Sequence, residues 1–275
     1  MKKIKRAERM VAVMQALMSE PNTLIPLTVL AERFGVAKST ISEDLLAIKE
    51  TMLYTGQGRL ETVSGAAGGV RYIPEIPADE ARGFLEILAE RLSSGDRLLA
   101  GGFLYMLDLL YDPKILRPLG LIFAGAFREE NPDVVVTIET KGIPLALVTA
   151  EALGVPMVII RHGNKVTEGT TVSINYVSGS SKRIQTMTLG RRALEPGKRV
   201  LIIDDFMKAG GTALGMINLL KEFEADVVGV GVLMEIRLED EPKLVSDYLS
   251  LLQLRELDLV NGIVQVVPQD ISFLD

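Results

Sequence analysis

Residues 200–212 read Val-Leu-Ile-Ile-Asp-Asp-Phe-Met-Lys-Ala-Gly-Gly-Thr, and this stretch decides the fold. Four apolar β-forming residues precede two carboxylates, small residues follow, and an apolar helical pattern starts near Thr212. This order predicts a buried parallel strand, a loop at its C-terminal end and the N-terminus of a helix. Loop amides and the helix dipole favour a phosphate, whereas Asp204 and Asp205 suit the vicinal hydroxyls of a ribose. Together these groups predict a site for a ribose 5-phosphate.

The chain around this stretch alternates between strand and helix patterns. Strands are predicted at 134–138, 157–160, 200–203 and 227–235, and helices at 78–93, 114–127, 143–153 and 212–223. This alternation is typical of an α/β fold with an open, mainly parallel sheet. Tyr105 lies in an apolar segment, 98–110, which we expect to be helical, and it is a candidate to reach the site.

Ligands of such sheets bind beyond the C-terminal ends of the strands, and two further segments fall there. Thr140-Lys141-Gly142 follows the strand at 134–138 and offers a cation and approachable amides to a pyrophosphate. Arg161 and Lys165 open a segment, 162–186, that is rich in serine and threonine. An ordinary solvated hairpin is the alternative interpretation of that segment. We expect His162 to be a loop residue near the ligand, because nothing supplies the nucleophile or partner that a general base needs.

The N-terminal residues predict a winged helix-turn-helix. Helical spacing covers 4–18, a short amphipathic helix covers 27–34, and a third helix starts at Ala37 after a turn at Gly35. Two strand patterns, 59–63 and 69–73, enclose five small residues and predict a β-hairpin wing. Winged helices also serve as dimerisation modules, so this fold alone does not establish DNA binding.

Basic and hydroxyl side chains of this module are the expected DNA contacts. Cations crowd the start of the first helix, where they oppose the helix dipole, so local stability does not explain them. Glu43 and Asp44 would repel DNA, and we expect them to face away and to favour the helix N-terminus. The predicted contacts are Lys2, Lys3, Lys5, Arg6, Arg9, Lys38, Ser39, Thr40, Ser42, Arg59, Gly65 and Arg71.

Composition separates the chain into a basic module and an acidic carrier. Residues 1–74 hold ten Lys/Arg against seven Asp/Glu, a balance of +3, which leaves −9 for the remainder of a chain whose net charge is −6. Pro74-Glu75-Ile76-Pro77 is a stiff linker, so we predict domains at 1–74 and 75–275. The absence of cysteine and a single histidine exclude a disulfide framework and a His-rich metal cluster. No apolar run of spanning length is present, and we expect a cytoplasmic protein without a membrane partner.

Residues 200–212 resemble, without gaps, the phosphoribosyl-pyrophosphate (PRPP) motif of type I phosphoribosyltransferases. Segment 162–186 is similar to the mobile arm of the adenine and xanthine enzymes, and 140–142 matches their pyrophosphate loop. Two departures argue against catalysis. Ala209 stands where the enzymes commonly carry a hydroxyl residue in the phosphate loop, with Lys208 adding a charge before it, and Tyr176-Val177-Ser178-Gly179 lacks the arm glutamate. The resemblance implies a type I phosphoribosyltransferase fold that binds PRPP as effector through Asp204, Asp205, Phe206, Met207, Lys208, Ala209, Gly210, Gly211, Thr212, Thr140, Lys141, Gly142, Arg161, Lys165 and Tyr105.

The whole chain resembles the purine operon repressors of Gram-positive bacteria. That resemblance implies a homodimer without enzymatic activity that binds operator DNA upstream of purine biosynthesis and transport genes and releases it when PRPP accumulates. Mg²⁺ is left open as an accompanying ion. Guanosine tetraphosphate is a hypothetical competing effector, on the ground of its diphosphates. A working purine phosphoribosyltransferase with an appended regulatory domain is the alternative, and a dimerising scaffold without a ligand is a third class.

Overall fold

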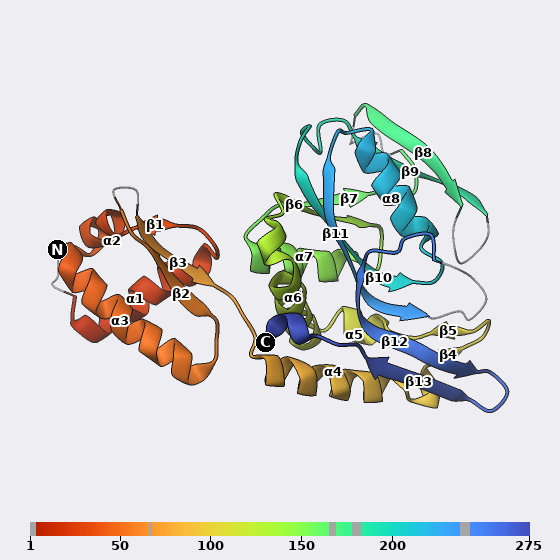
Figure 1. The fold of residues 1–275 in the computed structure, drawn as a ribbon, viewed down its shortest axis with the longest axis horizontal. Helices are drawn as coiled ribbons and strands as arrows, with labels where there is room; N and C mark the ends of the chain where they lie inside the picture. The colour runs from red at the N-terminus through yellow and green to blue at the C-terminus, as the bar shows by residue number, and fades with distance from the viewer. Residues whose placement is uncertain (1–3, 66–67, 165–168, 178–182, 237–242) are drawn as a thin grey trace. The chain divides into compact units, whose positions relative to one another are not determined.

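A computed structural model describes residues 4–65, 68–164, 169–177, 183–236 and 243–275. The chain forms two compact units. Their helices and strands are labelled in Figure 1. The first comprises the residues up to Pro77 together with Glu151–Gly154, and the second comprises Ala78–Ala150 and Val155–Asp275. Each unit is described in turn.

The N-terminal unit has the predicted winged-helix architecture. Its helices are α1 (Arg6–Ser19), α2 (Leu27–Phe34) and α3 (Lys38–Thr55), and its strands are β1 (Ile25–Pro26), β2 (Arg59–Val63) and β3 (Gly69–Ile73). Strands β2 and β3 form the hairpin wing, and β1, which was not predicted, pairs antiparallel with β3. Gly35 ends α2 in the left-handed conformation, with φ 63°, as the sequence indicated.

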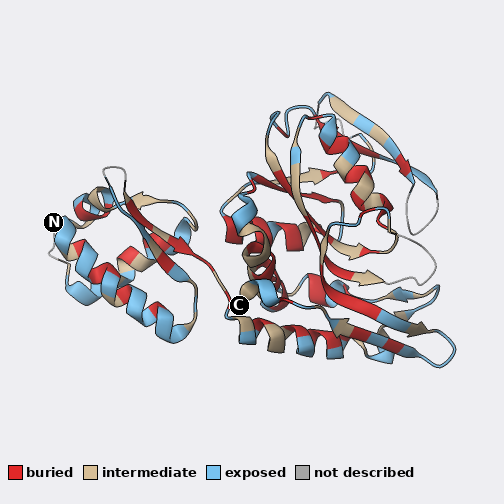
Figure 2. Cartoon of the chain, in the orientation of Figure 1, coloured by how far each residue is buried: buried red, intermediate tan, exposed pale blue. Residues whose placement is uncertain are grey.

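Apolar side chains at helical spacing close the core of this unit. The helices α1 and α3 bury one stripe each and leave the opposite face exposed, as Figure 2 shows. Strand β2 contributes one buried side chain and β3 several. The core comprises Val13, Leu17, Leu30, Ala31, Ile41, Leu45, Ile48, Met52, Leu60, Val70 and Tyr72.

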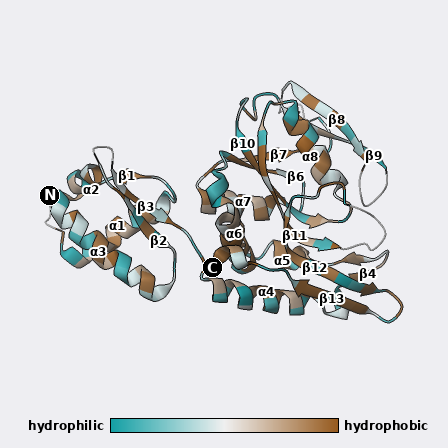
Figure 3. Ribbon diagram, viewed as in Figure 1, coloured by the Kyte–Doolittle hydropathy of each residue, from teal (hydrophilic) through white to brown (hydrophobic). Residues whose placement is uncertain are grey.

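The second unit is built on a six-stranded sheet in the order β13-β12-β11-β10-β6-β7. Its strands are β6 (Val134–Ile138), β7 (Met157–Ile160), β10 (Arg199–Met207), β11 (Asp226–Ile236), β12 (Leu249–Asp258) and β13 (Ile263–Pro268). All neighbouring pairs are parallel except β12–β13. Figure 3 shows the apolar character of the central strands, every residue of β6 being buried. The predicted mainly parallel sheet is confirmed, and β12 and β13 were not predicted.

Strand β10 is longer than predicted and includes the acidic pair. The prediction ended the strand at residue 203 and placed Asp204 and Asp205 in a loop. In the structure, β10 pairs with β11 as far as Met207, which lies opposite Glu235. The backbone ladder to a long neighbour therefore continues the strand beyond its apolar residues. As a consequence, the acidic pair lies on a rigid element.

Helices cover both faces of the sheet. They are α4 (Ala78–Leu92), α5 (Leu107–Leu110), α6 (Pro113–Phe127), α7 (Ile143–Leu153) and α8 (Gly211–Lys221), with short 3-10 turns at Gly95–Arg97, Arg128–Glu130 and Ser272–Leu274. One sheet face packs on α8 and on a hairpin of β8 (Thr171–Val177) and β9 (Ile184–Gly190). A second hairpin, β4 (Leu98–Leu99) with β5 (Phe103–Leu104), occupies part of the segment expected to be helical. Tyr105 therefore follows a strand instead of lying in a helix.

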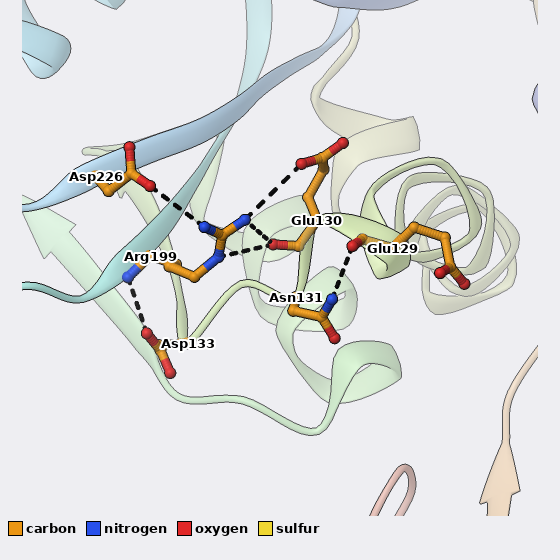
Figure 4. A network of polar contacts seen from close by, with 6 residues as sticks. All are labelled: Glu129, Glu130, Asn131, Asp133, Arg199 and Asp226. Carbon is orange, nitrogen blue, oxygen red and sulfur yellow. Dashed lines mark hydrogen bonds and ion pairs between the residues drawn. The ribbon is translucent and has the colours of Figure 1, made fainter.

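An arginine network holds the N-terminal ends of three strands together (Figure 4). The Arg199 guanidinium donates to the Glu130 carbonyl, at 2.7 Å from Nη2 and 3.0 Å from Nε, and pairs with Asp226 at 3.4 Å. Its backbone amide donates to Asp133 at 2.9 Å. This network sets how β10 starts between β6 and β11, and the opposite ends of these strands carry the candidate site.

Candidate functional site

A cavity of about 530 Å³ lies at the C-terminal ends of the central strands. Such ends are where open α/β sheets bind ligands. The cavity is bordered by the β10–α8 connection, by the loop after β6 and by hairpin β4–β5. The predicted effector residues that line it are Asp204, Asp205, Phe206, Met207, Lys208, Ala209, Gly210, Gly211, Thr212, Thr140 and Lys141.

Asp204 and Asp205 bring two carboxylates into a poorly solvated place. Asp204 is buried, and its Oδ1 accepts the backbone N–H of Asp205 at 2.9 Å. Burial raises the pKa of Asp204 well above its usual range, and the neighbouring charge of Asp205 adds to the rise. Burial also raises the pKa of Asp205, against the opposing effects of its hydrogen bond to Asp204 and the charge of Lys141. Hydroxyl groups of a ligand would therefore stabilise the charged form of this pair by donating hydrogen bonds to it.

The loop before α8 has the geometry of an anion site. Gly210 takes a left-handed conformation, φ 83°, at the N-cap position of α8, where, as a glycine, it has no side chain to cap the helix. The first amides of the helix are thus open to an external acceptor, and the helix dipole favours a negative one. Lys208, from the same loop, adds a half-buried cation to the lining. This part of the cavity suits a phosphate monoester.

Gly142 is required for packing and does not line the cavity. A Cβ at this position would lie 2.5 Å from Thr137 Oγ1 and 2.7 Å from Asp204 Oδ1. Because Gly142 has no side chain, the loop after β6 can approach Asp204 of β10 closely. Thr140 and Lys141, from the same loop, do line the cavity, and the Lys141 charge acts on Asp205. A cation and a carboxylate pair consequently face one cavity from two strand ends.

Glu139 was not anticipated from the sequence, and it engages a residue predicted to bind the effector. Its carboxylate accepts the backbone N–H of His162 at 2.6 Å and Nη1 of Arg161 at 3.1 Å. Glu139 and His162 line the cavity, whereas Arg161 and Tyr105 are not among the lining residues. Arg161 therefore ties the ends of β6 and β7 together. Lys165 lies outside the described residues.

The hairpin β8–β9 packs closely on helix α8. A Cβ at Gly215 would lie 2.7 Å from Met187 Cε and 3.1 Å from Tyr176 Cγ, so the glycine lets the hairpin approach the helix without displacing these side chains. The Tyr176 hydroxyl donates to Gln185 Oε1 at 2.7 Å, and both side chains line the cavity. Tyr176 also hydrogen-bonds Thr212 at the start of α8. Neither Tyr176 nor Gln185 was predicted as a site residue, and the resemblance to the enzyme arm was the only sequence signal for them.

In the N-terminal unit, a buried ion pair changes the interpretation of the basic helix start. Asp44 of α3 is fully buried, and its Oδ2 lies 2.5 Å from Nε of Arg9, which is also buried. Arg6 pairs with the other oxygen at 3.2 Å but leaves 62% of its side chain exposed. Asp44 faces away from solvent and hence from DNA, as expected, but it does so by pairing with α1, and Arg9 holds α1 against α3 instead of facing DNA. Arg6 and Lys5 remain accessible at the start of α1.

The other predicted DNA contacts fall into two groups. Lys38 and Ser39 are exposed in the first turn of α3, Thr40 is half-buried, and the exposed Ser42 donates its hydroxyl to the Lys38 carbonyl at 3.1 Å. In the wing, Arg59 lies opposite Ile73 and Arg71 opposite Glu61, so neither stands at the tip near Gly65. Both arginines pair with Glu61, and Arg59 also with Glu75. Lys2 and Lys3 lie outside the described residues.

The described part of the chain offers neither a membrane span nor a metal-binding cluster. None of its helices is both long and apolar enough to span a membrane. None of its acidic and histidine side chains gather in threes in a way that could hold a metal ion.

Comparisons with known proteins match both units. Residues 5–74 match the family model of the bacterial purine repressor N-terminal domain, and residues 107–269 match that of the phosphoribosyl transferase domain. The purine biosynthesis transcriptional repressor PurR of Bacillus subtilis (strain 168) is 52% identical over 96% of this chain and 92% of its own length. The purine biosynthesis transcriptional activator PurR of Lactococcus lactis subsp. lactis (strain IL1403) is 44% identical over 96% of this chain and 97% of its own.

Among solved structures, an adenine phosphoribosyltransferase from Rhodothermus marinus DSM 4252 is similar to the second unit. It is 26% identical, with a TM-score of 0.51, over 62% of this chain and 99% of the enzyme. The type I phosphoribosyltransferase fold expected from residues 200–212 is thereby confirmed. With this domain behind a purine-repressor N-terminal domain, and with relatives aligned over nearly the whole chain, the protein belongs to the PurR family of purine biosynthesis transcriptional regulators.

Proposed function

We propose that this protein is a repressor that binds operator DNA upstream of purine biosynthesis and transport genes as a homodimer and releases it when PRPP binds. The observation that carries the proposal is the meeting of three groups in one cavity: the buried carboxylate pair, the open N-terminus of α8 and Lys141. These groups correspond to the ribose hydroxyls, the 5′-phosphate and the pyrophosphate of PRPP. Because PRPP is a substrate of purine synthesis, its accumulation is a sensible signal for derepression.

PRPP carries several negative charges, so the cavity needs positive charges to balance those of the pyrophosphate. Lys141 and Lys208 line the cavity as positive charges, while Asp204, Asp205 and Glu139 line it as acids. We therefore leave room in the proposal for Mg²⁺, brought in with the pyrophosphate. Guanosine tetraphosphate is proposed as a competitor, since its diphosphates present the same chemistry to Lys141 and to the α8 N-terminus.

The proposed contact with DNA runs through α3 and the wing. Lys38, Ser39 and Thr40 open the second helix of the helix-turn-helix, which is the part of such modules that enters a major groove. Arg6 and Lys5 add exposed cations from α1. Homodimerisation is proposed because helix-turn-helix proteins commonly read paired half-sites as symmetric dimers.

We further propose that the chain does not catalyse phosphoribosyl transfer. Ala209 supplies no hydroxyl to the phosphate loop, and among the described residues at the cavity the arm contributes His162, Tyr176 and Gln185, none of which is an acid. The competing proposal is an active purine phosphoribosyltransferase, which the match to that enzyme domain favours. Incubation of the protein with PRPP and labelled hypoxanthine, xanthine, guanine or adenine separates the two. Turnover near ordinary enzyme rates, about 1 per second or more, would establish the enzyme.

A gel-shift titration with a purine-gene promoter fragment tests the central proposal. The protein should retard the fragment, and PRPP should release it in a concentration-dependent way, whereas ribose 5-phosphate alone should be less effective because it lacks the pyrophosphate. Retardation that strengthens with PRPP would contradict release by PRPP. No binding of PRPP by calorimetry would leave only a dimerising scaffold.

A further inference from the structure

A largely buried polar cluster, centred on one carboxylate, stands beside the phosphate loop, outside the cavity lining. Glu235, near the end of β11, exposes only 12% of its side chain. Its carboxylate accepts hydrogen bonds from Lys243 Nζ and the Tyr248 hydroxyl, and from Nε2 of Gln253 at 3.1 Å. The Lys243 ammonium also lies 5.0 Å from the centroid of the Tyr248 ring. One carboxylate thus organises donors from β12 and from the segment before it.

These donors keep Glu235 charged despite its burial. Burial alone would raise the pKa of Glu235, but the hydrogen bonds from Lys243 and Tyr248 and the Lys243 charge outweigh it, and the pKa is lowered. A charged acceptor holds an ammonium more firmly than a neutral one does. Lys243 is therefore fixed at the point where the chain returns to the sheet.

The residues after Lys243 form a wall of the phosphate loop. The backbone N–H of Leu244 donates to the Ala209 carbonyl at 2.9 Å. A Cβ on Gly210 would lie 3.3 Å from the Val245 nitrogen and 3.5 Å from the Leu244 nitrogen. Val245 itself is buried in the core cluster that includes Met207 and Ala213. The segment 243–245 is thus packed against the loop over several residues.

The hydrogen bond from Leu244 has a defined consequence for the loop amides. The Ala209 carbonyl and the Gly210 N–H belong to one planar trans peptide, so they point in opposite directions. When Leu244 holds the carbonyl, the Gly210 N–H points away from Leu244. Glycine at φ 83° then continues the turn into the open amides of α8. Without the bond, this peptide can rotate and present its carbonyl, which repels an anion.

We propose that Glu235 is a positioning residue for the phosphate loop: through Lys243 and the Leu244 amide it sets the orientation of the Ala209–Gly210 peptide that receives the 5′-phosphate of the effector. The proposal rests on the proposed function, because it assigns the loop to a sugar phosphate. It concerns the 5′-phosphate alone, since the pyrophosphate subsite at Thr140 and Lys141 follows a different strand, β6.

Two probes that each fill one subsite test this separation. Calorimetry with ribose 5-phosphate reports on the α8 loop, and calorimetry with inorganic pyrophosphate reports on the loop after β6. Glu235→Gln and Lys243→Met should weaken ribose 5-phosphate binding by roughly 10-fold or more, as expected for losing a hydrogen bond to a charged group. Pyrophosphate affinity should stay within about 2-fold of wild type. Lys243→Arg should rescue much of the loss because it keeps the charge.

A matched control and a local readout separate positioning from general stability. Glu222→Gln removes an exposed carboxylate after α8 and should change neither affinity. Hydrogen exchange should show faster exchange at the Leu244 amide in Glu235→Gln, with unchanged protection in β6. If the variants lost affinity for both probes equally, or kept the wild-type affinity for ribose 5-phosphate, the positioning role would be overturned. Failure of wild type to bind either probe would overturn the proposed function first, and the inference with it.

Discussion

The buried Arg9–Asp44 pair makes a sharp prediction about the N-terminal unit. Asp44 is fully buried, and Arg9, with 9% of its side chain exposed, lies 2.5 Å from it. Removing one partner of a buried pair leaves an uncompensated charge and typically costs about 3–5 kcal/mol. In Arg9→Met, Arg6 still reaches the other oxygen at 3.2 Å, so we expect the lower end of that range, about 3 kcal/mol. Arg6→Ala removes an exposed partner and should cost about 0–1 kcal/mol.

Hydrogen exchange at the α3 amides is the suitable assay. The chain has two compact units, so a single unfolding curve would not isolate the first, and it contains no tryptophan to report on either. A loss of about 3 kcal/mol should speed globally controlled exchange in α3 by roughly 100-fold, while β6 in the other unit keeps its protection. Replacing both partners, in Arg9→Met with Asp44→Leu, should recover most of the loss because no charge is then left buried.

DNA binding supplies the second readout and the refutation. Arg6→Ala and Lys38→Ala should each shrink the salt slope of log K by roughly 0.9 if each residue contacts one phosphate. Arg9→Met should reduce the fraction of protein that is folded and able to bind DNA, and it should leave the salt slope of log K for the folded protein unchanged. Unchanged α3 exchange in Arg9→Met, together with a slope reduced by about 0.9, would show that Arg9 leaves Asp44 to contact DNA, and would refute the structural role.

Four further predictions concern the cavity and the loop packed beside it. Asp204→Ala or Asp205→Ala should lower PRPP affinity by roughly 5- to 150-fold and leave effector-free DNA affinity near wild type, so that PRPP titrated into a preformed operator complex no longer releases it at the wild-type concentration. Because the pKa of both carboxyls is raised, this pair adds stability to the unliganded fold below their ordinary pKa, and that contribution is lost as pH rises through the raised values; the unfolding free energy of wild type minus that of Asp204→Asn should therefore fall as pH rises across this window. Calorimetry over the same window should show PRPP affinity rising with pH, since the ionised pair accepts the hydroxyls. Gly142→Ala, whose Cβ would lie 2.5 Å from Thr137 Oγ1, should cost about 1–3 kcal/mol in unfolding free energy, and an unaltered Tm would contradict the packing role.

Local patterns were sufficient where an element is defined by its own residues. The strands at 134–138 and 157–160 and the helix at 143–153 have the predicted bounds, because each is an apolar run set off by its neighbouring residues, and every residue of the central strand 134–138 is buried. The wing strands, 59–63 and 69–73, were equally clear from their small-residue turn. Strands β12 and β13 were not predicted. The residues of β12 are mainly leucine with charged and amide side chains, which are as common in helices as in strands.

Residue patterns alone were enough to predict the α/β fold, the winged helix and the position of the acidic pair before a helix N-terminus, since each depends on residues adjacent in the chain. Which charges are available for binding depends instead on contacts between distant segments. Arg9 and Asp44 are 35 residues apart and meet because α1 packs on α3, which turns a predicted DNA contact into a buried ion pair. Glu235 acts on Ala209 through the Lys243–Leu244 segment, and the extension of β10 depends on its ladder with β11. Such pairings require the chain to fold back on itself, and no local pattern of residue types encodes the partner.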